Sequence, residues 1–457
     1  MSFHIDPEVK PRPASTTATL TGDVVRAGDP GYEEARLGWN RLYSRYPEAI
    51  VFCRNTQDVV NAVAWAREEG IALRARSGRH SLEGWSSIDG GLVIDVSRLR
   101  NFDIDETAHT VTVGTGLTQA ETVASLGRRG FVIPTGSEGG VGLGGVILGG
   151  GFGLLTRTFG LACDNLLAAE IVVADGTRSA KVVEATEHVD SDLLWACRGG
   201  GGGNFGIATS YTLKLRELSD VAFLIARWTG HADLGALLRT WQRDAPVADE
   251  RLTSALEADS AAVELSALLY GGTRRQLESE VRPLLAIGNP ELSFTEGAWP
   301  NIYRLVDRGS DVPFWKFYSQ FVTRAFPDEA IDLVVRFMEN TPSGPSNFFC
   351  TSFGGAVRHD PPGGSAFAHR DALFYCEPGA AWNDPALNAR ALGWAADFWR
   401  ALRPYGNGAY VNVPNAAAAN WEREYYGPHR ERLRRVKTAY DPENVFSFEQ
   451  SVPPRAG

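Results

Sequence analysis

A run of glycines from Gly136 to Gly153, GSEGGVGLGGVILGGGFG, limits the fold of this chain more than any other feature. Glycine has no side chain, so such a run favours places where the backbone packs tightly or touches a phosphate or a flat ring. A second run, RGGGGGNFGIAT, covers 198–209. Neither run follows the strand–GxGxxG–helix order of a Rossmann site, and the chain has no GxxxxGK[ST] phosphate loop. The runs predict either a ligand-binding surface of another architecture or tight turns without a ligand.

The first β-α-β pattern ends in a turn that carries a histidine. The apolar stretch 49–53 predicts a strand, Thr56 the N-cap of a helix, and 71–76 a second strand. The turn at 77–81, SGRHS, follows directly. Consecutive backbone N–H groups in such a turn can hold a diphosphate, and the neutral imidazole of His80 is a nucleophile towards an electrophilic carbon. On these residues alone, a hydrogen-bonded surface histidine is the more common outcome.

The pattern changes after about Leu218. Strand-like stretches then alternate with amphipathic helices, and no glycine-rich turn recurs. A chain of 457 residues is too long to fold around one simple hydrophobic core, so we predict two lobes. The first domain covers 1–220, a second domain 221–404, and a segment of loop and helix 405–457. The fold class is α/β (α+β), with the second domain built on an antiparallel sheet backed by helices.

Charge and cysteine usage exclude several classes of function. The net charge of −10 argues against a nucleic-acid partner. No apolar run approaches the ~20 residues of a membrane helix, and the loose N-terminal tail has no signal-peptide core. The five cysteines show no CxxC and no zinc-finger spacing, so we expect no metal. We expect a cytoplasmic monomer or homodimer that acts on a small molecule and binds neither nucleic acid nor membrane.

Five segments, taken in order, resemble the berberine-bridge-enzyme-like branch of the vanillyl-alcohol-oxidase flavoproteins, which have a PCMH-type FAD-binding fold. The middle of the chain matches only weakly, whereas the first half and the C-terminal segment match well. The segments are RSGRHS at 76–81, LGGGFGLLTRTFGLACDN at 148–165, VVADG at 172–176 with a turn at its Asp-Gly pair, WACRGGGGGNFGIAT at 195–209, and the close at 405–457 with YYGPHRERLRRVKTAYDPENVF.

The resemblance implies that the first domain and the C-terminal segment together bind FAD, and that the middle domain roofs the isoalloxazine ring. It also implies a covalent bond from His80 to the flavin 8α-methyl carbon. The cofactor-binding residues that it predicts are Arg76, Ser77, Gly78, Arg79, His80, Ser81, Gly142, Gly144, Gly145, Gly149, Gly150, Gly153, Asn204, Gly206, Ile207 and Asn412.

Two departures from the family pattern bear on the chemistry. Many relatives carry a second, cysteine link to the flavin, and Glu138 takes the place of that cysteine here. We therefore expect a single link through His80, with Glu138 facing the flavin or the substrate. Many relatives also have a tyrosine that acts as, or positions, a catalytic base, and Val413 stands at that place. A base, if one is needed, must come from elsewhere.

The strand-like stretch DALFYCE offers such a base. Its alternation places Tyr375 and Glu377 on one face, and in similar proteins this strand crosses above the flavin. Glu377 is the candidate base and Tyr375 would orient the substrate, whereas an exposed strand edge with a solvated carboxylate is the competing interpretation. A second stretch, WKFYSQF, makes Trp315, Lys316, Tyr318 and Gln320 candidates for the pocket wall, although half-buried strands commonly show such a pattern.

The leading hypothesis is an oxidase that transfers a hydride to His-linked FAD, with dioxygen as the electron acceptor. Its substrate would be a secondary-metabolite alcohol, a sugar or a ring carbon. An alternative keeps the flavin as a scaffold for a non-redox cyclisation or elimination, because the tyrosine is missing. A flavin-free binding protein is a third hypothesis, which the near-complete set of motifs disfavours.

Overall fold

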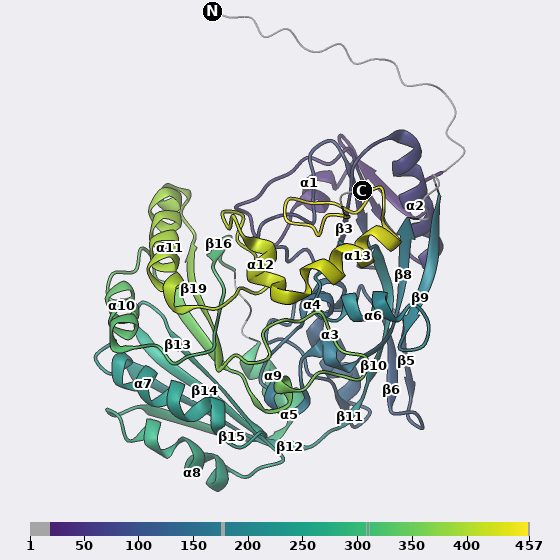
Figure 1. The fold of residues 1–457 in the computed structure, drawn as a ribbon. Coiled ribbons are helices and arrows are strands. Elements are labelled where there is room, and N and C mark those ends of the chain that lie inside the picture. Colours follow the sequence, from purple (N-terminus) through teal and green to yellow (C-terminus); the bar gives the residue numbers. More distant parts are fainter. Residues whose placement is uncertain (1–18, 175–178, 308, 310, 456–457) are drawn as a thin grey trace, which may run out of the picture.

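The computed structural model describes residues 19–174, 179–307, 309 and 311–455. The expected N-terminal tail and the Asp-Gly turn of VVADG lie outside these residues. Figure 1 shows two lobes side by side. The first lobe contains the N-terminal half of the chain together with the C-terminal segment, and the second contains one large sheet with helices on its outer side.

A four-stranded sheet in the order β1-β2-β4-β3 opens the first lobe. Its strands are β1 (Asp23–Arg26), β2 (Ala49–Phe52), β3 (Leu73–Arg76) and β4 (Leu92–Asp95). Helix α2 (Thr56–Glu69) joins β2 to β3, and the predicted N-cap is wrong by one residue. The side chain of Asn55 caps the helix by accepting from the Asp58 N–H, whereas the Thr56 hydroxyl donates to Glu170. Asn is as good a cap as Thr, so the sequence alone does not separate the two.

The second sheet of the first lobe is antiparallel, in the order β5-β6-β10-β8-β9. Its strands are β5 (Phe102–Asp105), β6 (Thr110–Gly114), β8 (Leu166–Ala174), β9 (Ala180–Thr186) and β10 (Ile207–Lys214). Buried side chains of this sheet share one core with helices α4 (Leu143–Gly149), α6 (Ser191–Cys197) and α13 (Arg430–Tyr440). The helices α4 and α13 are therefore fixed parts of the first lobe.

The large sheet of the second lobe is antiparallel, in the order β15-β12-β14-β13-β18-β19-β16, with β17 also paired to β19. Its strands are β12 (Asp220–Thr229), β13 (Leu252–Ala258), β14 (Ala262–Tyr270), β15 (Glu291–Ala298), β16 (Phe314–Phe317), β17 (Gln320–Val322), β18 (Asn347–Ser352) and β19 (Phe374–Trp382). One face packs against α7 (Leu234–Asp244), α8 (Arg274–Leu285), α10 (Asp328–Met338) and α11 (Asn388–Leu402). These helices lie on the side away from the first lobe (Figure 1), so the other face of the sheet is turned towards it.

The C-terminal segment returns to the first lobe and is locked there by a buried lysine. Lys437 in α13 is fully buried and donates to the carbonyl oxygens of Asn204 and Phe446 and to the carboxylate of Asp441. A buried ammonium needs such partners, because an unpaired charge in the interior is very costly.

Among the described residues, no helix is both long and apolar enough to cross a membrane.

Candidate cofactor and substrate site

A cavity of about 710 Å³ lies between the turn after β3, the glycine segment and the open face of the large sheet. Its size is typical of sites for small molecules and cofactors. The predicted site residues that line it are Arg76, Ser77, Gly78, Arg79, His80, Ser81, Glu138, Gly142, Gly144, Gly145, Gly153, Gly206, Ile207, Tyr375, Glu377 and Asn412. The structure thus brings together residues from both lobes and from the C-terminal segment.

The turn after β3 presents unpaired backbone donors to this cavity. The N–H groups of Gly78, Arg79 and His80 donate to no other described residue, and Arg79 has a φ of 65°, in the left-handed region. A non-glycine residue in that region turns successive N–H groups towards one side, which is the geometry of an anion-binding nest. The Gly78 backbone packs directly on Gly142 at the start of α4: a Cβ at Gly78 would lie 2.3 Å from the Gly142 nitrogen. The two glycine-containing segments therefore touch backbone to backbone.

Replacing Gly78 with alanine should reduce the amount of flavin that the purified protein carries. The new Cβ must push the turn away from Gly142, and overpacking of this kind costs about 1–3 kcal/mol. We expect the ratio of flavin absorbance at 450 nm to protein absorbance to fall severalfold. Gly393→Ala in α11, where a Cβ meets no atom within 4 Å, is the matched control. Equal flavin ratios in both variants would contradict the role of this contact.

Arg76 adds buried N–H groups without partners at the same wall. Its Nε donates to the Asp95 carboxylate at 2.6 Å, and its two Nη atoms have no partner among the described residues although they are buried. A buried guanidinium with free N–H groups calls for acceptors, and phosphate oxygens suit its geometry. The unpaired turn and Arg76 therefore fit the diphosphate of an FAD, and the cavity offers space for its rings.

His80 lies at this wall as a neutral imidazole. Burial lowers its pKa to about 4, so the ring carries no proton charge at neutral pH. Its Nε2–Cε1 edge lies against Gly140, where a Cβ would come within 3.2 Å of Nε2. An uncharged ring nitrogen keeps the lone pair that a covalent bond to the flavin would require.

Three of the predicted cofactor residues lie behind the wall of the cavity. A Cβ at Gly149 would overlap the Asn412 side chain, and one at Gly150 would lie 3.3 Å from Tyr410. The Asn204 amide donates to the Gly200 carbonyl and accepts from the Val452 N–H. These residues hold the segments that form the wall, and Asn412, which does line the cavity, donates to the Val146 carbonyl.

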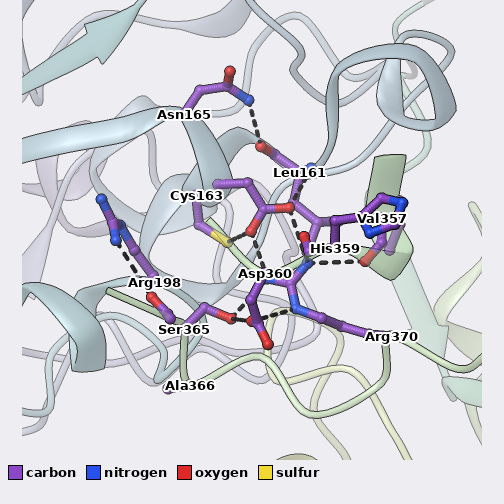
Figure 2. Close-up of polar contacts among 12 residues, drawn as sticks. Leu161, Cys163, Asn165, Arg198, Val357, His359, Asp360, Ser365, Ala366 and Arg370 are labelled. Carbon is purple, nitrogen blue, oxygen red and sulfur yellow. Dashed lines mark hydrogen bonds and ion pairs between the residues drawn. The ribbon is translucent and has the colours of Figure 1, made fainter. Parts of the chain in front are cut away.

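Figure 2 shows a network of polar contacts around Arg370. Arg370 binds both oxygens of Asp164, at 2.6 and 3.2 Å, and also pairs with Asp360 at 2.7 Å. The short helix η1 (Ala162–Asn165) that carries Asp164 donates two N–H groups to the carbonyls of Gly150 and Gly151. The neighbouring His369 is buried, stacks on Phe321 and hydrogen-bonds the Tyr425 carbonyl. The network therefore fixes the glycine turn from behind.

We expect Arg370→Met to destabilise the protein by about 3–5 kcal/mol, because it leaves the nearly buried Asp164 carboxylate without its cation. Urea unfolding followed by circular dichroism measures the change. Arg400→Met is the control, since the Arg400–Asp397 pair is exposed and such pairs contribute about 0–1 kcal/mol. If both variants unfold at the same urea concentration, the network does not have this role.

The open face of the large sheet forms the roof of the cavity. Glu377 of β19 pairs in register with Phe349 of β18, which pairs with Glu257 of β13, so these three side chains form one row across the sheet. Tyr375 lies beside the row and its hydroxyl donates to the Glu377 carboxylate. The pKa of Glu377 is raised to about 7: burial is the main cause, the Tyr375 hydrogen bond lowers the pKa, and the nearby charges of Glu257 and Glu138 raise it. A carboxyl group with such a pKa can take up and release a proton near neutrality.

Glu138 reaches into the same cavity from the first lobe. Desolvation by the cavity walls, together with Asp307 and Glu257, raises its pKa. The Gly139 N–H next to it donates to Asp307, which fixes the backbone at this point. The charge of Glu138 thus raises the pKa of Glu377 from the opposite lobe.

The prediction for the WKFYSQF stretch was correct only for Trp315, which lines the cavity together with Phe317. Lys316 points to the other side and pairs with the buried Glu83, and Tyr318 stacks on Trp399. Gln320 is buried on β17. The strand bends after β16, so one alternating pattern does not run through the whole stretch.

Sequence reasoning missed the roof residues of β13 and β14. Glu257 and Glu264 line the cavity, and each interrupts an otherwise apolar or small-residue strand. A lone acidic residue at an inward-facing position of such a strand is the signal that would have found them.

Comparison with known proteins agrees with this geometry. The family model described as an FAD binding domain matches residues 47–179, and the one described as berberine and berberine like matches residues 409–453. The uncharacterized FAD-linked oxidoreductase YvdP of Bacillus subtilis (strain 168) is 39% identical over 444 residues, which are 95% of this chain and 98% of that protein. The xylooligosaccharide oxidase of Thermothelomyces thermophilus is 29% identical, over 89% of this chain and 87% of that protein.

A solved structure, that of the wild-type BBE-like 1 protein of Physcomitrella patens, superposes with a TM-score of 0.88 at 28% identity, over 96% of this chain and 98% of that one. These likenesses confirm the expected PCMH-type fold of helices and antiparallel sheets. The chain belongs to the berberine-bridge-enzyme-like FAD-linked oxidases, and it is an FAD-linked oxidoreductase.

Proposed function

We propose that this protein oxidises a small organic molecule by hydride transfer to an FAD held covalently through His80 alone, and that dioxygen then takes up the electrons. The observation that carries the proposal is the pairing of two groups across one cavity. A neutral imidazole lies at the wall with the anion-binding turn, and a carboxyl group with a pKa near 7 lies on the roof.

Each residue of the site would have a separate role in binding the cofactor or in the reaction. The turn at 77–81 and Arg76 hold the diphosphate, and His80 supplies the nitrogen of the covalent bond. Bound FAD supplies the two-electron acceptor for the hydride. Glu377 accepts the O–H or N–H proton of the substrate, and Tyr375 fixes the orientation of that carboxylate through its hydrogen bond.

Two features support a single link and a carboxylate base. No cysteine among the described residues lines the cavity, and all five cysteines are buried elsewhere. The place at which many relatives carry a tyrosine is occupied by Val413, which lines the cavity but cannot take a proton. Of the described side chains at the roof, Glu377 combines a raised pKa with a hydrogen bond that orients it.

The substrate class is proposed as an alcohol, a sugar or a ring carbon of a secondary metabolite. Aromatic rings of Phe349, Phe317 and Trp315 at the roof suit a flat or cyclic substrate. The similarity to a xylooligosaccharide oxidase supports the inclusion of sugars.

An assay of hydrogen peroxide release across sugars, aromatic alcohols and cyclic secondary metabolites tests the proposal. The same compounds are then added to the enzyme without oxygen, where an oxidised substrate must bleach the flavin absorbance near 450 nm. Turnover of a compound without bleaching would contradict the proposal and favour a non-redox cyclisation or elimination. Bleaching without peroxide in air would contradict only the assignment of dioxygen.

A further inference from the structure

We propose that Trp39 is the positioning residue for His80: its indole holds the imidazole ring in the orientation in which the covalent bond to the flavin forms. This inference rests on the proposed linkage through His80. Trp39 belongs to no motif that the sequence analysis singled out. It lies in the loop after the first short helix, α1 (Tyr32–Arg36), and lines the cavity.

The imidazole is enclosed on two sides and hydrogen-bonded on neither. The Trp39 ring stacks on it with a centroid distance of 5.1 Å and an interplanar angle of 21°. The Gly140 backbone lies against the Nε2–Cε1 edge. Among the described residues, no hydrogen bond to either ring nitrogen holds the imidazole, so packing alone sets its direction.

The loop that carries Trp39 is itself firmly held. The backbone N–H of Trp39 donates to the Arg79 carbonyl at 2.9 Å. This bond ties the backbone that carries the indole to the turn that carries His80. The next side chain, Asn40, is almost completely buried and donates from Nδ2 to the Leu82 and Trp315 carbonyls, both at 2.9 Å. It also accepts from the Trp315 N–H at 3.2 Å. The pair Trp39–Asn40 therefore bridges the turn at 77–81 and strand β16.

The stack continues from Trp39 into the roof. Trp315 stacks on Trp39 with a centroid distance of 5.4 Å, and Phe317 stacks on Trp315 at 5.1 Å. All of these rings line the cavity. Because rings stacked in series resist tilting, His80 is braced against the second lobe rather than against its own turn alone.

The physical consequence concerns the rate of bond formation. Attachment would replace one C–H bond of the flavin 8α-methyl group with a bond to the His80 nitrogen. The two electrons of that C–H bond, with one proton from the methyl group and one from the imidazole, would pass to the flavin, and dioxygen would reoxidise the reduced flavin. The bond forms only when the nitrogen lone pair points at that carbon at near-contact distance, and a displacement of about 1 Å can cost on the order of 10²-fold in rate. Removal of the indole frees the imidazole to rotate. A methyl group at position 140 would instead push its Nε2 edge by a few tenths of an ångström.

The test compares Trp39→Ala, Trp39→Phe and Gly140→Ala with the wild-type protein. Each purified protein is denatured in acid, and the share of flavin absorbance that stays with the polypeptide is measured. The time course of attachment after FAD is added to protein made under riboflavin limitation gives the rate. We expect at least a tenfold slower attachment in Trp39→Ala and an intermediate rate in Gly140→Ala, whereas Trp39→Phe keeps a ring on the imidazole and stays close to wild type.

Two controls separate this role from a general loss of structure. Trp394→Ala removes a half-buried indole from α11, far from the cavity wall, and Gly393→Ala adds a methyl group in open space. Both should attach flavin at the wild-type rate. Circular dichroism shows whether Trp39→Ala folds. If it does not, the attachment rate of Gly140→Ala tests whether the position of the imidazole sets the rate.

The outcomes distinguish the inference from the proposed function. Wild-type rates in Trp39→Ala and Gly140→Ala would overturn the role of Trp39 and leave the linkage intact. A wild-type protein that releases all its flavin in acid would overturn the His80 linkage and this inference together. Slow attachment in Trp39→Ala with rescue by Trp39→Phe is the result that the inference requires.

Discussion

In His80→Ala, all of the flavin should leave the polypeptide on acid denaturation, whereas the wild-type pellet should stay yellow. The substitution removes the single nucleophile proposed for the linkage, and no cysteine among the described residues lines the cavity to replace it. The variant should still bind FAD reversibly, because the turn N–H groups and Arg76 remain.

Reversible binding makes the stability of the variant depend on free cofactor. A ligand that binds only the folded state stabilises it by about 4 kcal/mol at a thousandfold excess over Kd, and by nothing when it is removed. The melting temperature of His80→Ala should therefore rise with added FAD, whereas that of the wild type should not change. His188→Ala, an exposed histidine near the end of β9, is the control for loss of an imidazole. A His80→Ala protein with covalent flavin would show that another residue forms the bond.

Glu377→Gln should lower kcat/KM by about 10²- to 10⁴-fold for a substrate that must lose a proton, which is the usual contribution of a general base. The amide keeps the size of the side chain and can still accept from Tyr375, so the pocket should stay intact. The measurement uses a substrate identified by peroxide release. Glu291→Gln removes an exposed carboxylate from the edge of the same sheet and should leave kcat/KM unchanged. Equal rates in wild type and Glu377→Gln would remove Glu377 from the chemistry.

The pH profile gives a second test of the same group. The base must be deprotonated to accept a proton, so kcat/KM should rise with pH through a midpoint near 7 and then level off. Tyr375→Phe removes a hydrogen bond that lowers the pKa of Glu377, so the midpoint should move to higher pH. Glu138→Gln removes a charge that raises this pKa, so the midpoint should move to lower pH. Shifts in the same direction in both variants would contradict this assignment.

The same raised pKa has the opposite effect on stability. The carboxyl group of Glu377 binds its proton more tightly in the folded protein than in the unfolded chain, where its pKa is near 4.5. Its contribution to stability is therefore fully present below pH 4.5 and is lost as the pH rises through about 7. Deprotonation of Glu377 near pH 7 therefore produces the proposed base and, at the same pH, removes its contribution to the free energy of unfolding.

Local sequence signals marked two segments of the first lobe that line the cavity, the turn at 77–81 and the glycine run. The strand that becomes β3 and the turn after it carry their signals within a few residues, and Gly142 lies where its backbone packs against that of Gly78. The roof was predicted only at Tyr375 and Glu377, whose alternation is local. Glu257 reaches the cavity through pairing with Phe349, about ninety residues further along the chain, and no local pattern reveals such a register.

The short helix α4 illustrates a different limit. Glycines disfavour a helix interior, so the run at 142–150 predicts turns, yet Leu143–Gly149 is helical. Buried Leu143, Ile147 and Leu148 in the shared core outweigh the low propensity. Trp39 was not predicted as a site residue, because it lies in a loop and loops show no hydrophobic periodicity that would mark an inward-facing side chain.

The last turns of the chain have a consequence for how the protein is made. Tyr410, Tyr425, Phe446 and Gln450 are part of the cavity wall, and Lys437 locks their segment onto residues of the first lobe. The cavity wall is therefore complete only after residues up to Gln450 have been synthesised and have folded onto the first lobe. A molecule cleaved before residue 405 would lack this part of the wall, and we expect it to hold FAD less tightly than the intact chain.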